Sequence, residues 1–182
     1  MKTCFIGHRK VFAKNIRERI EEAIKTEMEN GCTTFLVGTH GDFDGWALAA
    51  CRNLRKTHPE IDIEVVITSL NILKKSNDEY RDNPYDDVRT VMFDIEKAHF
   101  KQKITLSNRM MIDECDTLIC YVDEDECRSG AKTAMRYAKK RGLKIVNLYR
   151  EEDHPFYGMT KEESDALWNS LCEKVFGKKE KK

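Results

Sequence analysis

The segment Gly7-His8-Arg9 brings together three residue types that can bind or act on a phosphorylated ligand. Glycine lets the backbone turn tightly, and the planar guanidinium of arginine can hold a phosphate through two hydrogen bonds. His8 can hydrogen-bond a ligand or exchange a proton with it near neutral pH. The residue types are equally consistent with a second interpretation, in which His8 caps the next helix or packs within a loop.

A second segment contains Gly38 and Thr39 and continues to Asp44. Glycine and threonine between a strand and a helix suit an anion bound at the helix N-terminus, where backbone N–H groups point outward. Acidic side chains cap a helix but repel phosphate, so we assign Asp44 to capping or to the hydroxyl groups of a ribose. An ordinary turn with a capping aspartate explains the spacing at least as well.

Two further segments lie in the second half of the chain. Asn108 and Arg109 fall on a predicted helix that leads into a strand. Ser129 and Gly130 open the next helix, with Thr133 in its first turn, and such a turn can cradle phosphate through backbone N–H groups. The spacing is not that of a Walker A loop, and Ser129 is also an ordinary N-cap residue.

Short apolar runs alternate with amphipathic stretches along most of the chain. The spacing of Ile16, Ile20 and Ile24 places one apolar stripe on a helix. Helices between short apolar strands favour parallel pairing in a sheet covered on both faces, which binds ligands at the carboxyl ends of its strands. We therefore predict an α/β fold, a Rossmann-like three-layer sandwich with a mainly parallel central sheet. The predicted strands are 3–7, 33–37, 61–68, 117–122 and 144–148, and the predicted helices are 15–30, 43–56, 107–114 and 131–141.

The sequence shows no internal repeat and no linker, so we predict a single domain over residues 1–182. Residues 69–103 are polar and rich in turn-forming residues, and we expect an insertion there that is either a lid over a site or a surface excursion. A capping box at Thr160–Glu163 predicts a C-terminal helix over residues 160–176. Its apolar face is expected to pack on the domain's own sheet, with a contact between the subunits of a homodimer as the alternative.

Charge and cysteine content limit the classes of partner. The 32 basic and 32 acidic residues balance, so the net charge does not favour nucleic acid or an anionic membrane as a partner. The seven cysteines are odd in number and lack C-x-x-C spacing, which favours reduced thiols over disulfides or a zinc site. His40 and His99 stand alone, so we expect no metal site. The chain enters a strand at once and has no membrane-spanning stretch, and we expect a cytoplasmic protein.

Four motifs follow one another along the chain: Cys4–Arg9; Phe35–Gly38 with Phe43, Asp44 and Ala47; Arg109–Asp113 with Asp116; and Gly130–Thr133 with Tyr137 and Ala138. Together they resemble the SLOG superfamily, and most closely its small bacterial members, many of them from Firmicutes. The resemblance runs to Leu148 and is weakest in the insertion. It implies a Rossmann-like fold that binds nucleotides or nucleotide-derived ligands. Relatives include the LOG phosphoribohydrolases and the DNA-processing proteins that load recombinase on single strands.

The LOG phosphoribohydrolases resemble this chain around an arginine in one motif and a Pro-Gly-Gly-x-Gly-Thr-x-x-Glu run in another. Arg109 matches the arginine and Thr133 matches the threonine, but Arg136 stands where the glutamate is expected. Cleavage of an N-glycosidic bond develops positive charge on the ribose, which a carboxylate stabilises and an arginine opposes. The resemblance therefore favours a retained pocket without the reaction of these enzymes.

Three hypotheses about function follow. The favoured one is binding or sensing of a small nucleotide or nucleotide-derived ligand with a phosphorylated ribose, without any required cofactor. In this hypothesis the phosphate lies near Gly38-Thr39 and Ser129-Gly130, Arg9 and Arg109 supply positive charge, and Asp44 contacts the ribose. The alternative is a phosphoribohydrolase-like N-glycosidase acting on a nucleoside monophosphate, with Arg109, Asp44 and Asp113 as catalytic candidates and Asp123 as a further carboxylate. The third is single-strand DNA binding, which the zero net charge and the lack of interleaved aromatic and basic residues oppose.

Overall fold

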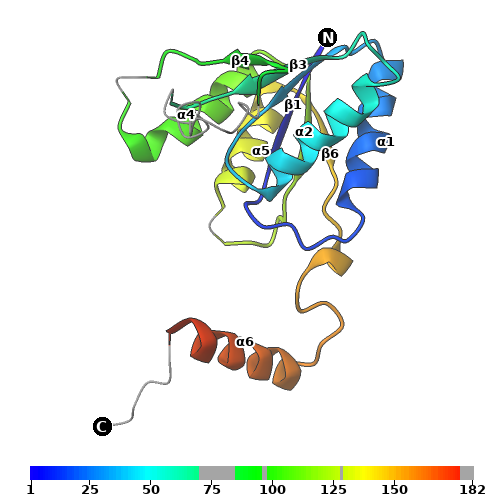
Figure 1. Cartoon of the computed structure of the whole chain (residues 1–182). Coiled ribbons are helices and arrows are strands. Elements are labelled where there is room, and N and C mark those ends of the chain that lie inside the picture. Colours follow the sequence, from blue (N-terminus) through cyan, green and yellow to red (C-terminus); the bar gives the residue numbers. More distant parts are fainter. Residues whose placement is uncertain (70–84, 96–97, 128, 177–182) are drawn as a thin grey trace, which may run out of the picture. The chain divides into compact units, whose positions relative to one another are not determined.

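The computed structural model describes residues 1–69, 85–95, 98–127 and 129–176. It divides into two units, residues 1–149 and residues 150–182, and each is described by itself. The strands of the first unit are β1 (Lys2–Gly7), β2 (Thr34–Val37), β3 (Asp62–Val66), β4 (Arg89–Val91), β5 (Thr117–Tyr121) and β6 (Lys144–Asn147) (Figure 1). Its helices are α1 (Ile16–Glu29), α2 (Asp42–Arg55), α4 (Phe100–Asp113) and α5 (Gly130–Arg141).

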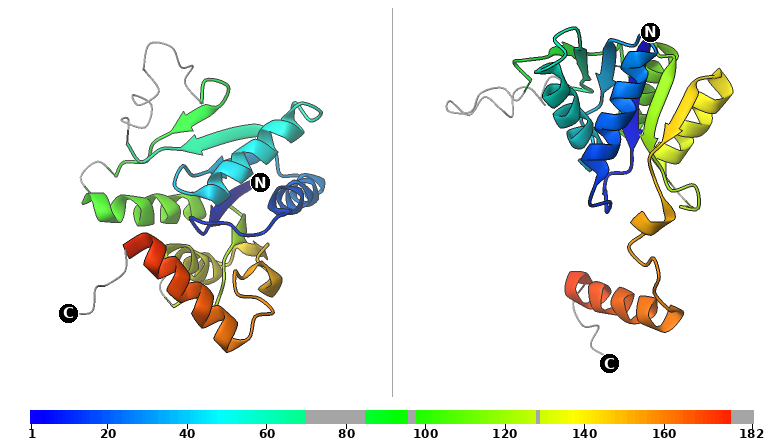
Figure 2. Two further views of the ribbon diagram at one scale, coloured as in Figure 1. Left: turned by 60° about the horizontal axis from the view of Figure 1, so that its bottom comes forward. Right: turned by 90° about the vertical axis from the view of Figure 1, so that its right-hand side faces the viewer.

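The sheet is parallel throughout, with the strand order β4-β3-β2-β1-β5-β6. In β1, Thr3 lies opposite Phe35 of β2 on one side and opposite Thr117 of β5 on the other. The chain builds outward from β1 to β4 and then returns to the other side of β1 for β5 and β6. Helices α1 and α2 cover one face of the sheet, and α4 and α5 cover the other (Figure 2). This architecture confirms the predicted Rossmann-like α/β fold.

Two apolar clusters fill the spaces between the sheet and its two helical layers. Phe5 of β1 belongs to the cluster under α1 and α2, together with the predicted helix stripe that includes Ile20. Its neighbours Cys4 and Ile6 belong to the cluster under α4 and α5. Successive side chains of a strand point to opposite faces, so a sheet covered on both sides needs strands that are apolar at almost every position.

Each of the nine strands and helices predicted within residues 1–149 is present. Helix α4 begins at Phe100, earlier than the predicted residue 107. The early start was missed because the sequence before Phe100 has no typical capping residue to signal it. Strand β4 was not predicted; it is short and lies at the sheet edge, and two of its three residues are exposed, so it has no apolar run to signal it. Residues 70–84 and 96–97 of the expected insertion lie outside the described residues, so its role as a lid or an excursion stays a prediction.

The second unit contains a short 3₁₀ turn, η1 (Glu151–Asp153), and helix α6 (Lys161–Phe176). The predicted capping box is present at the start of α6, because the Thr160 N–H donates to Glu163 Oε2 at 2.8 Å and the Glu163 N–H donates to Thr160 Oγ1 at 3.3 Å. How α6 packs stays a prediction. Within the described ranges, no helix combines the length and the apolar character needed to cross a membrane.

Candidate functional site

The order of the strands reverses between β1 and β5, and the loops after these strands lead to opposite faces of the sheet. Such a reversal opens a crevice at the carboxyl edge of a parallel sheet, where ligands of α/β proteins bind. Gly7 ends β1 in register with Tyr121, which ends β5. A Cβ at position 7 would lie 2.4–2.7 Å from side-chain atoms of Phe43 in α2, so the first predicted segment needs glycine for close packing.

His8 joins the two sides of this crevice. Its backbone N–H donates to the Tyr121 carbonyl at 3.1 Å, and its Nε2 accepts the Asp123 backbone N–H at 2.7 Å. Its Nδ1 lies 2.9 Å from Glu126 Oε2 and 3.2 Å from Ser129 Oγ. Burial lowers the pKa of His8 below its usual value, although Glu126 and Asp123 raise it in part. The first and fourth predicted segments therefore meet at His8, which packs between loops.

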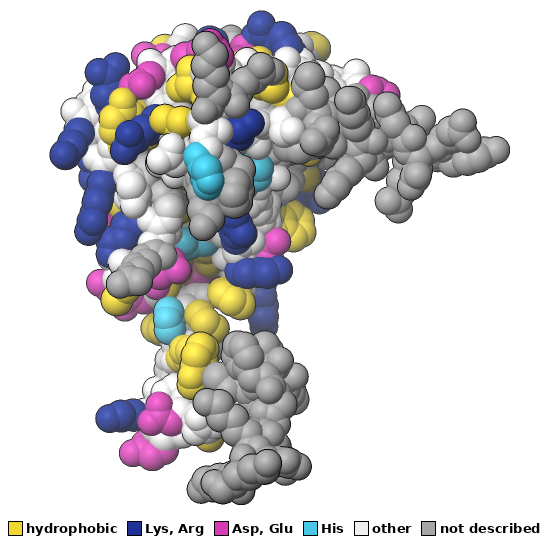
Figure 3. Space-filling view, turned by 90° about the vertical axis from the view of Figure 1, so that its left-hand side faces the viewer, with side chains coloured by type: hydrophobic (Ala, Val, Ile, Leu, Met, Phe, Trp, Pro, Cys, Tyr) yellow, Lys and Arg dark blue, Asp and Glu magenta, His cyan; other side chains and the backbone are white. Residues whose placement is uncertain are grey.

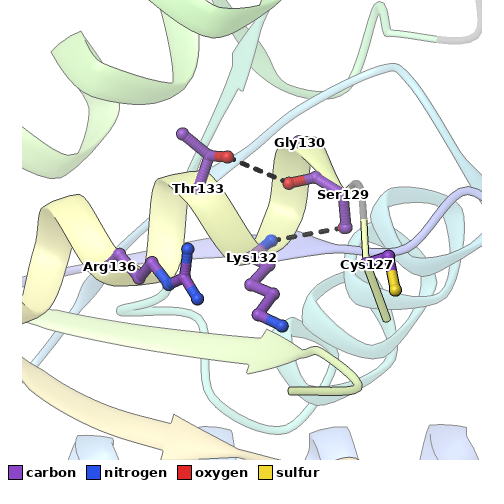
Figure 4. A pocket seen from close by; sticks show the side chains of 6 residues that line it. All are labelled: Cys127, Ser129, Gly130, Lys132, Thr133 and Arg136. Carbon is purple, nitrogen blue, oxygen red and sulfur yellow. Dashed lines mark hydrogen bonds between the residues drawn. The ribbon is translucent and has the colours of Figure 1, made fainter. Parts of the chain in front are cut away.

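The fourth segment forms the N-terminus of α5. Ser129 is the N-cap, with its Oγ accepting the Lys132 N–H at 3.3 Å, and Thr133 Oγ1 donates to the Ser129 carbonyl at 3.1 Å. An open hollow of about 430 Å³ lies beside this turn (Figure 4). It is lined by Cys127, Ser129, Gly130, Lys132, Thr133 and Arg136.

Two cationic side chains line the hollow, Lys132 and Arg136. They stand one turn apart on α5 and extend to the same side of the helix (Figure 4). Lys132 Nζ also donates to the Glu126 carbonyl at 3.1 Å, which holds the ammonium near the loop. The positive end of the α5 dipole adds to these charges, so the hollow favours an anion. Arg136 thus lies at the site itself, with a charge opposite to that of the glutamate in LOG-type enzymes.

The second predicted segment forms the start of α2. Asp44 does not cap this helix from the N-cap position, which Gly41 occupies, but its Oδ2 accepts the His40 N–H at 2.8 Å. A Cβ at Gly38 would lie 2.6 Å from Asp44 Oδ2, so glycine lets the carboxylate lie against the backbone. Burial raises the pKa of Asp44 to about 6, and the hydrogen bond from His40 lowers it only in part. Among the described residues, the buried Thr39 Oγ1 has no hydrogen-bond partner.

The start of α2 adjoins the loop after β1. The Asp42 N–H donates to the Arg9 carbonyl at 2.9 Å, and a Cβ at Gly41 would lie 2.9 Å from Arg9 Cα. His40 Nε2 lies 3.0 Å from Thr68 Oγ1, just beyond β3. Burial lowers the pKa of His40, and the charge of Arg9 lowers it further. Polar groups from the ends of β1, β2 and β3 therefore meet at the same edge as the α5 hollow.

The third predicted segment lies on α4, beside α5. Arg109 Cζ lies 5.5 Å from the centre of the Tyr137 ring, a cation–π contact. Asp113 Oδ1 accepts a hydrogen bond from the Tyr137 hydroxyl at 2.9 Å, and Asp113 also pairs with Arg141 Nε at 2.8 Å. Both partners lie in the second half of α5, away from its N-terminus. The contacts shown for this segment thus run along the α4–α5 surface, where Asn108 is also half-buried.

Sequence reasoning assigned no role to Thr68, His40 or Glu126. Thr68 comes at the end of a predicted strand, and that position alone could have marked it as a residue of the carboxyl edge. The contact of Glu126 with His8 joins residues that are far apart in the chain, and no local pattern signals it. Over the described part of the chain, no group of three or more His, Cys, Asp or Glu side chains is placed to hold a metal ion.

The fold and the contacts between its loops define a Rossmann-like α/β protein with polar loops gathered at the switch point of its sheet. The sequence matches the model of the YspA SLOG family, named YpsA, over residues 4–152. Because this match covers most of the chain, the protein belongs to the YspA SLOG family, as the motif resemblance predicted.

The structure resembles that of DNA processing protein A from Helicobacter pylori, with a TM-score of 0.59. The two proteins share 15% sequence identity, and the match covers 93% of this chain and 73% of the other. The Helicobacter protein is described as having a unique single-stranded DNA binding mode. At this level of identity the similarity establishes the fold alone. A search of curated proteins gives no match to the sequence.

Proposed function

We propose that the carboxyl-edge crevice binds a nucleotide or a nucleotide-derived ligand with a phosphorylated ribose. The observation that carries this proposal is the meeting of three loops at the switch point of the sheet. The four contacts of His8 join the loop after β1 to β5 and the loop after it, and the bond from the Asp42 N–H to the Arg9 carbonyl joins the start of α2. A switch-point crevice next to a helix N-terminus is where α/β proteins bind phosphorylated ligands. Membership of a SLOG family agrees with this function.

The phosphate is assigned to the hollow at the start of α5. Lys132 and Arg136 supply positive charge there, and Ser129 supplies a hydroxyl group. We assign the direct contact to Arg136, since the guanidinium of Arg109 lies over Tyr137. An arginine beside the ligand also opposes the positive charge that glycosidic cleavage develops on ribose, so the proposal is binding without hydrolysis.

The ribose is assigned to the start of α2. The Asp44 carboxylate can accept hydrogen bonds from sugar hydroxyl groups, and the unpartnered Thr39 hydroxyl can donate or accept one. A buried carboxylate whose pKa is raised to about 6 is typical of functional sites. The ligand would then span the crevice from α2 to α5.

Native mass spectrometry of the purified full chain, followed by calorimetry with AMP, tests this proposal. We expect a co-purified or added nucleotide to bind, and Arg136→Ala to weaken AMP binding about tenfold, as expected for a lost charge-assisted hydrogen bond. Arg109→Ala is the matched control and should weaken binding less. The assignment fails if Arg109→Ala has the larger effect. Release of free base from AMP at high protein concentration would instead support the N-glycosidase alternative.

A second candidate function is single-strand DNA binding. Two aromatic side chains at the carboxyl-edge end of the first unit are exposed, Phe12 by 58% and Trp46 by 43%, and Phe12 belongs to the same loop as Arg9 and Lys10. Exposed aromatic rings beside basic residues suit the stacking of unpaired bases. Lysine and arginine side chains also lie along one edge of the first unit in the view of Figure 3.

A gel shift with an oligothymidylate at low salt tests this second candidate. Binding that Trp46→Ala weakens, and that Tyr157→Ala leaves unchanged, would support it; Tyr157 is an exposed aromatic residue of the second unit. Absence of a shift at low salt, where phosphate contacts are strongest, would exclude it.

A further inference from the structure

We infer that His8 is a positioning residue whose neutral ring holds the start of the β5–α5 loop against the end of β1, so that acidification loosens one wall of the crevice. The inference about the loop stands on the contacts of the ring. Its consequence for ligand binding rests on the proposed function.

The proton position on the ring follows from the Asp123 contact. A backbone N–H can only donate, so Nε2, which accepts it at 2.7 Å, must carry a lone pair. The neutral ring then carries its proton on Nδ1. This proton is donated to Glu126 Oε2 at 2.9 Å or to Ser129 Oγ at 3.2 Å. The structure thus selects one of the two neutral tautomers.

This tautomer decides how the Ser129 hydroxyl can be used. Because Nδ1 already carries a proton, it cannot accept the Ser129 hydroxyl proton. Ser129 Oγ accepts the Lys132 N–H and faces the protonated Nδ1 of His8. Its own proton is therefore left for an acceptor in the hollow that Ser129 lines. His8 in this form prepares Ser129 to donate to an anion such as a phosphate.

A second proton on the ring would remove the link to Asp123. With Nε2 protonated, the ring N–H would face the Asp123 N–H, and two donors cannot bond each other. Asp123 then loses its hydrogen bond to His8, while the bond from the His8 backbone N–H to the Tyr121 carbonyl remains. The pairing with Glu126 gains a full charge, but its carboxylate is 48% exposed, and such exposed pairs contribute little.

The groups around the ring determine when this happens. Among the described residues, the charged groups that face it are Glu126 and Asp123 of the β5–α5 loop, and β5 contributes the uncharged edge contact of Tyr121. On the α2 side Gly41 approaches the His8 carbonyl, and the next residue, Asp42, is paired with Lys10. Burial outweighs the two carboxylates and lowers the pKa of His8 from 6.5. The ring is therefore neutral at pH 7 and gains its second proton only below pH 6.5.

Nuclear magnetic resonance of the ligand-free full chain tests the inference directly. Long-range ¹H–¹⁵N correlation at neutral pH should show His8 protonated on Nδ1 and unprotonated on Nε2. As the pH is lowered through the titration of the His8 ring, the amide signals of Asp123 and Ser129 should shift with the same midpoint as the ring. The inference would be overturned by a neutral ring protonated on Nε2, or by an Asp123 amide signal that does not change as His8 titrates.

Two variants separate positioning from a general effect of acid. In His8→Gln the amide oxygen can still accept the Asp123 N–H but cannot titrate, so the Asp123 amide should no longer respond in this pH range. His58→Gln replaces an exposed histidine that is paired with Glu60, and in this variant the Asp123 amide should respond to pH as it does in the wild type. If His8→Gln retains the pH response of the Asp123 amide, the inference is wrong.

The consequence for the ligand is measured with AMP. Between neutral pH and the pH at which the titration shows His8 to be protonated, wild-type affinity should fall roughly five- to tenfold more than that of His8→Gln, the equivalent of one hydrogen bond. An equal fall in both proteins would contradict the link to binding. Absence of AMP binding at every pH would count against the proposed function, while the ligand-free titration would still decide the role of His8.

Discussion

At the scale of single residues, Asp44 has the clearest conflict between stability and a functional position. Its carboxylate is partly buried and accepts one backbone N–H, from His40. Burial disfavours the charged form and raises the pKa of Asp44 from 3.8 to about 6. The folded protein therefore binds this proton more tightly than the unfolded chain does, and keeping Asp44 ionised at neutral pH lowers the free energy of unfolding.

Asp44→Asn should make the protein more stable at neutral pH, by up to about 3 kcal/mol for a shift of roughly two pKa units. Asparagine keeps an acceptor for the His40 N–H and removes the buried charge. Urea unfolding of both proteins measures the difference. The advantage should shrink as the pH falls from about 6 toward 4, where wild-type Asp44 becomes neutral. An Asp44→Asn protein that is less stable than the wild type at neutral pH would contradict this explanation.

The same substitution separates stability from binding. Asparagine donates as well as accepts, and it lacks the charge that favours bonds from ribose hydroxyl groups. We therefore expect the more stable variant to bind a nucleotide less tightly, a trade-off typical of residues kept for function.

At the scale of elements, the packing of β1 against α2 keeps the crevice loops together. Phe43 of α2 stacks on Tyr121 at the end of β5, with ring centroids 6.0 Å apart, and covers the position where Gly7 lacks a side chain. The carboxyl ends of β1 and β5 are thus fixed to the start of α2 through one aromatic pair. A change at this contact should affect the fold and the site together.

Two glycine substitutions test this packing. Gly7→Ala places a methyl group against the buried Phe43 ring and should destabilise the protein by about 1–3 kcal/mol. Gly45→Ala, on the exposed side of α2 with no atom within 4 Å, should stabilise it by roughly 0.5–1 kcal/mol. Thermal or urea unfolding gives both values. Equal effects of the two changes would show that the contact with Phe43 is not tight.

The elements were largely predictable, because their signals are local. Apolar patterns such as the stripe of Ile16, Ile20 and Ile24, together with the short apolar runs of the strands, predicted nine helices and strands of the first unit. Strand β4 was not predicted, because an exposed edge strand has no apolar pattern in its sequence. In the candidate site, His8 was predicted because it follows directly after a strand. Its contacts with Asp123 and Glu126 could not be predicted in the same way, because they depend on the pairing of β1 with β5. Tertiary contacts of this kind have no signal in a single sequence.

At the scale of the whole molecule, the two units differ in how much core they contain. In the described part of the chain, both apolar clusters and all six strands lie within residues 1–149. The family match ends close to this boundary, at residue 152. Whether α6 packs on the sheet or mediates a homodimer stays a prediction, since the two units are described separately.

A chain shortened to residues 1–153 tests whether the first unit is complete. We expect it to unfold cooperatively, because both apolar clusters of the described residues lie within residues 1–149. Circular dichroism during urea unfolding measures this. Loss of cooperative unfolding would show that residues after 153 complete the core.

The most direct test of the central claim is to map AMP binding on the full chain by ¹H–¹⁵N chemical shifts. We predict saturable shifts gathered at the carboxyl edge, in residues 7–9, 38–44 and 129–136 together with Asp123. Saturable shifts confined to the second half of α5 and the adjoining face of α4, or no shifts with either AMP or ribose 5-phosphate, would contradict a nucleotide site in the crevice between β1 and β5.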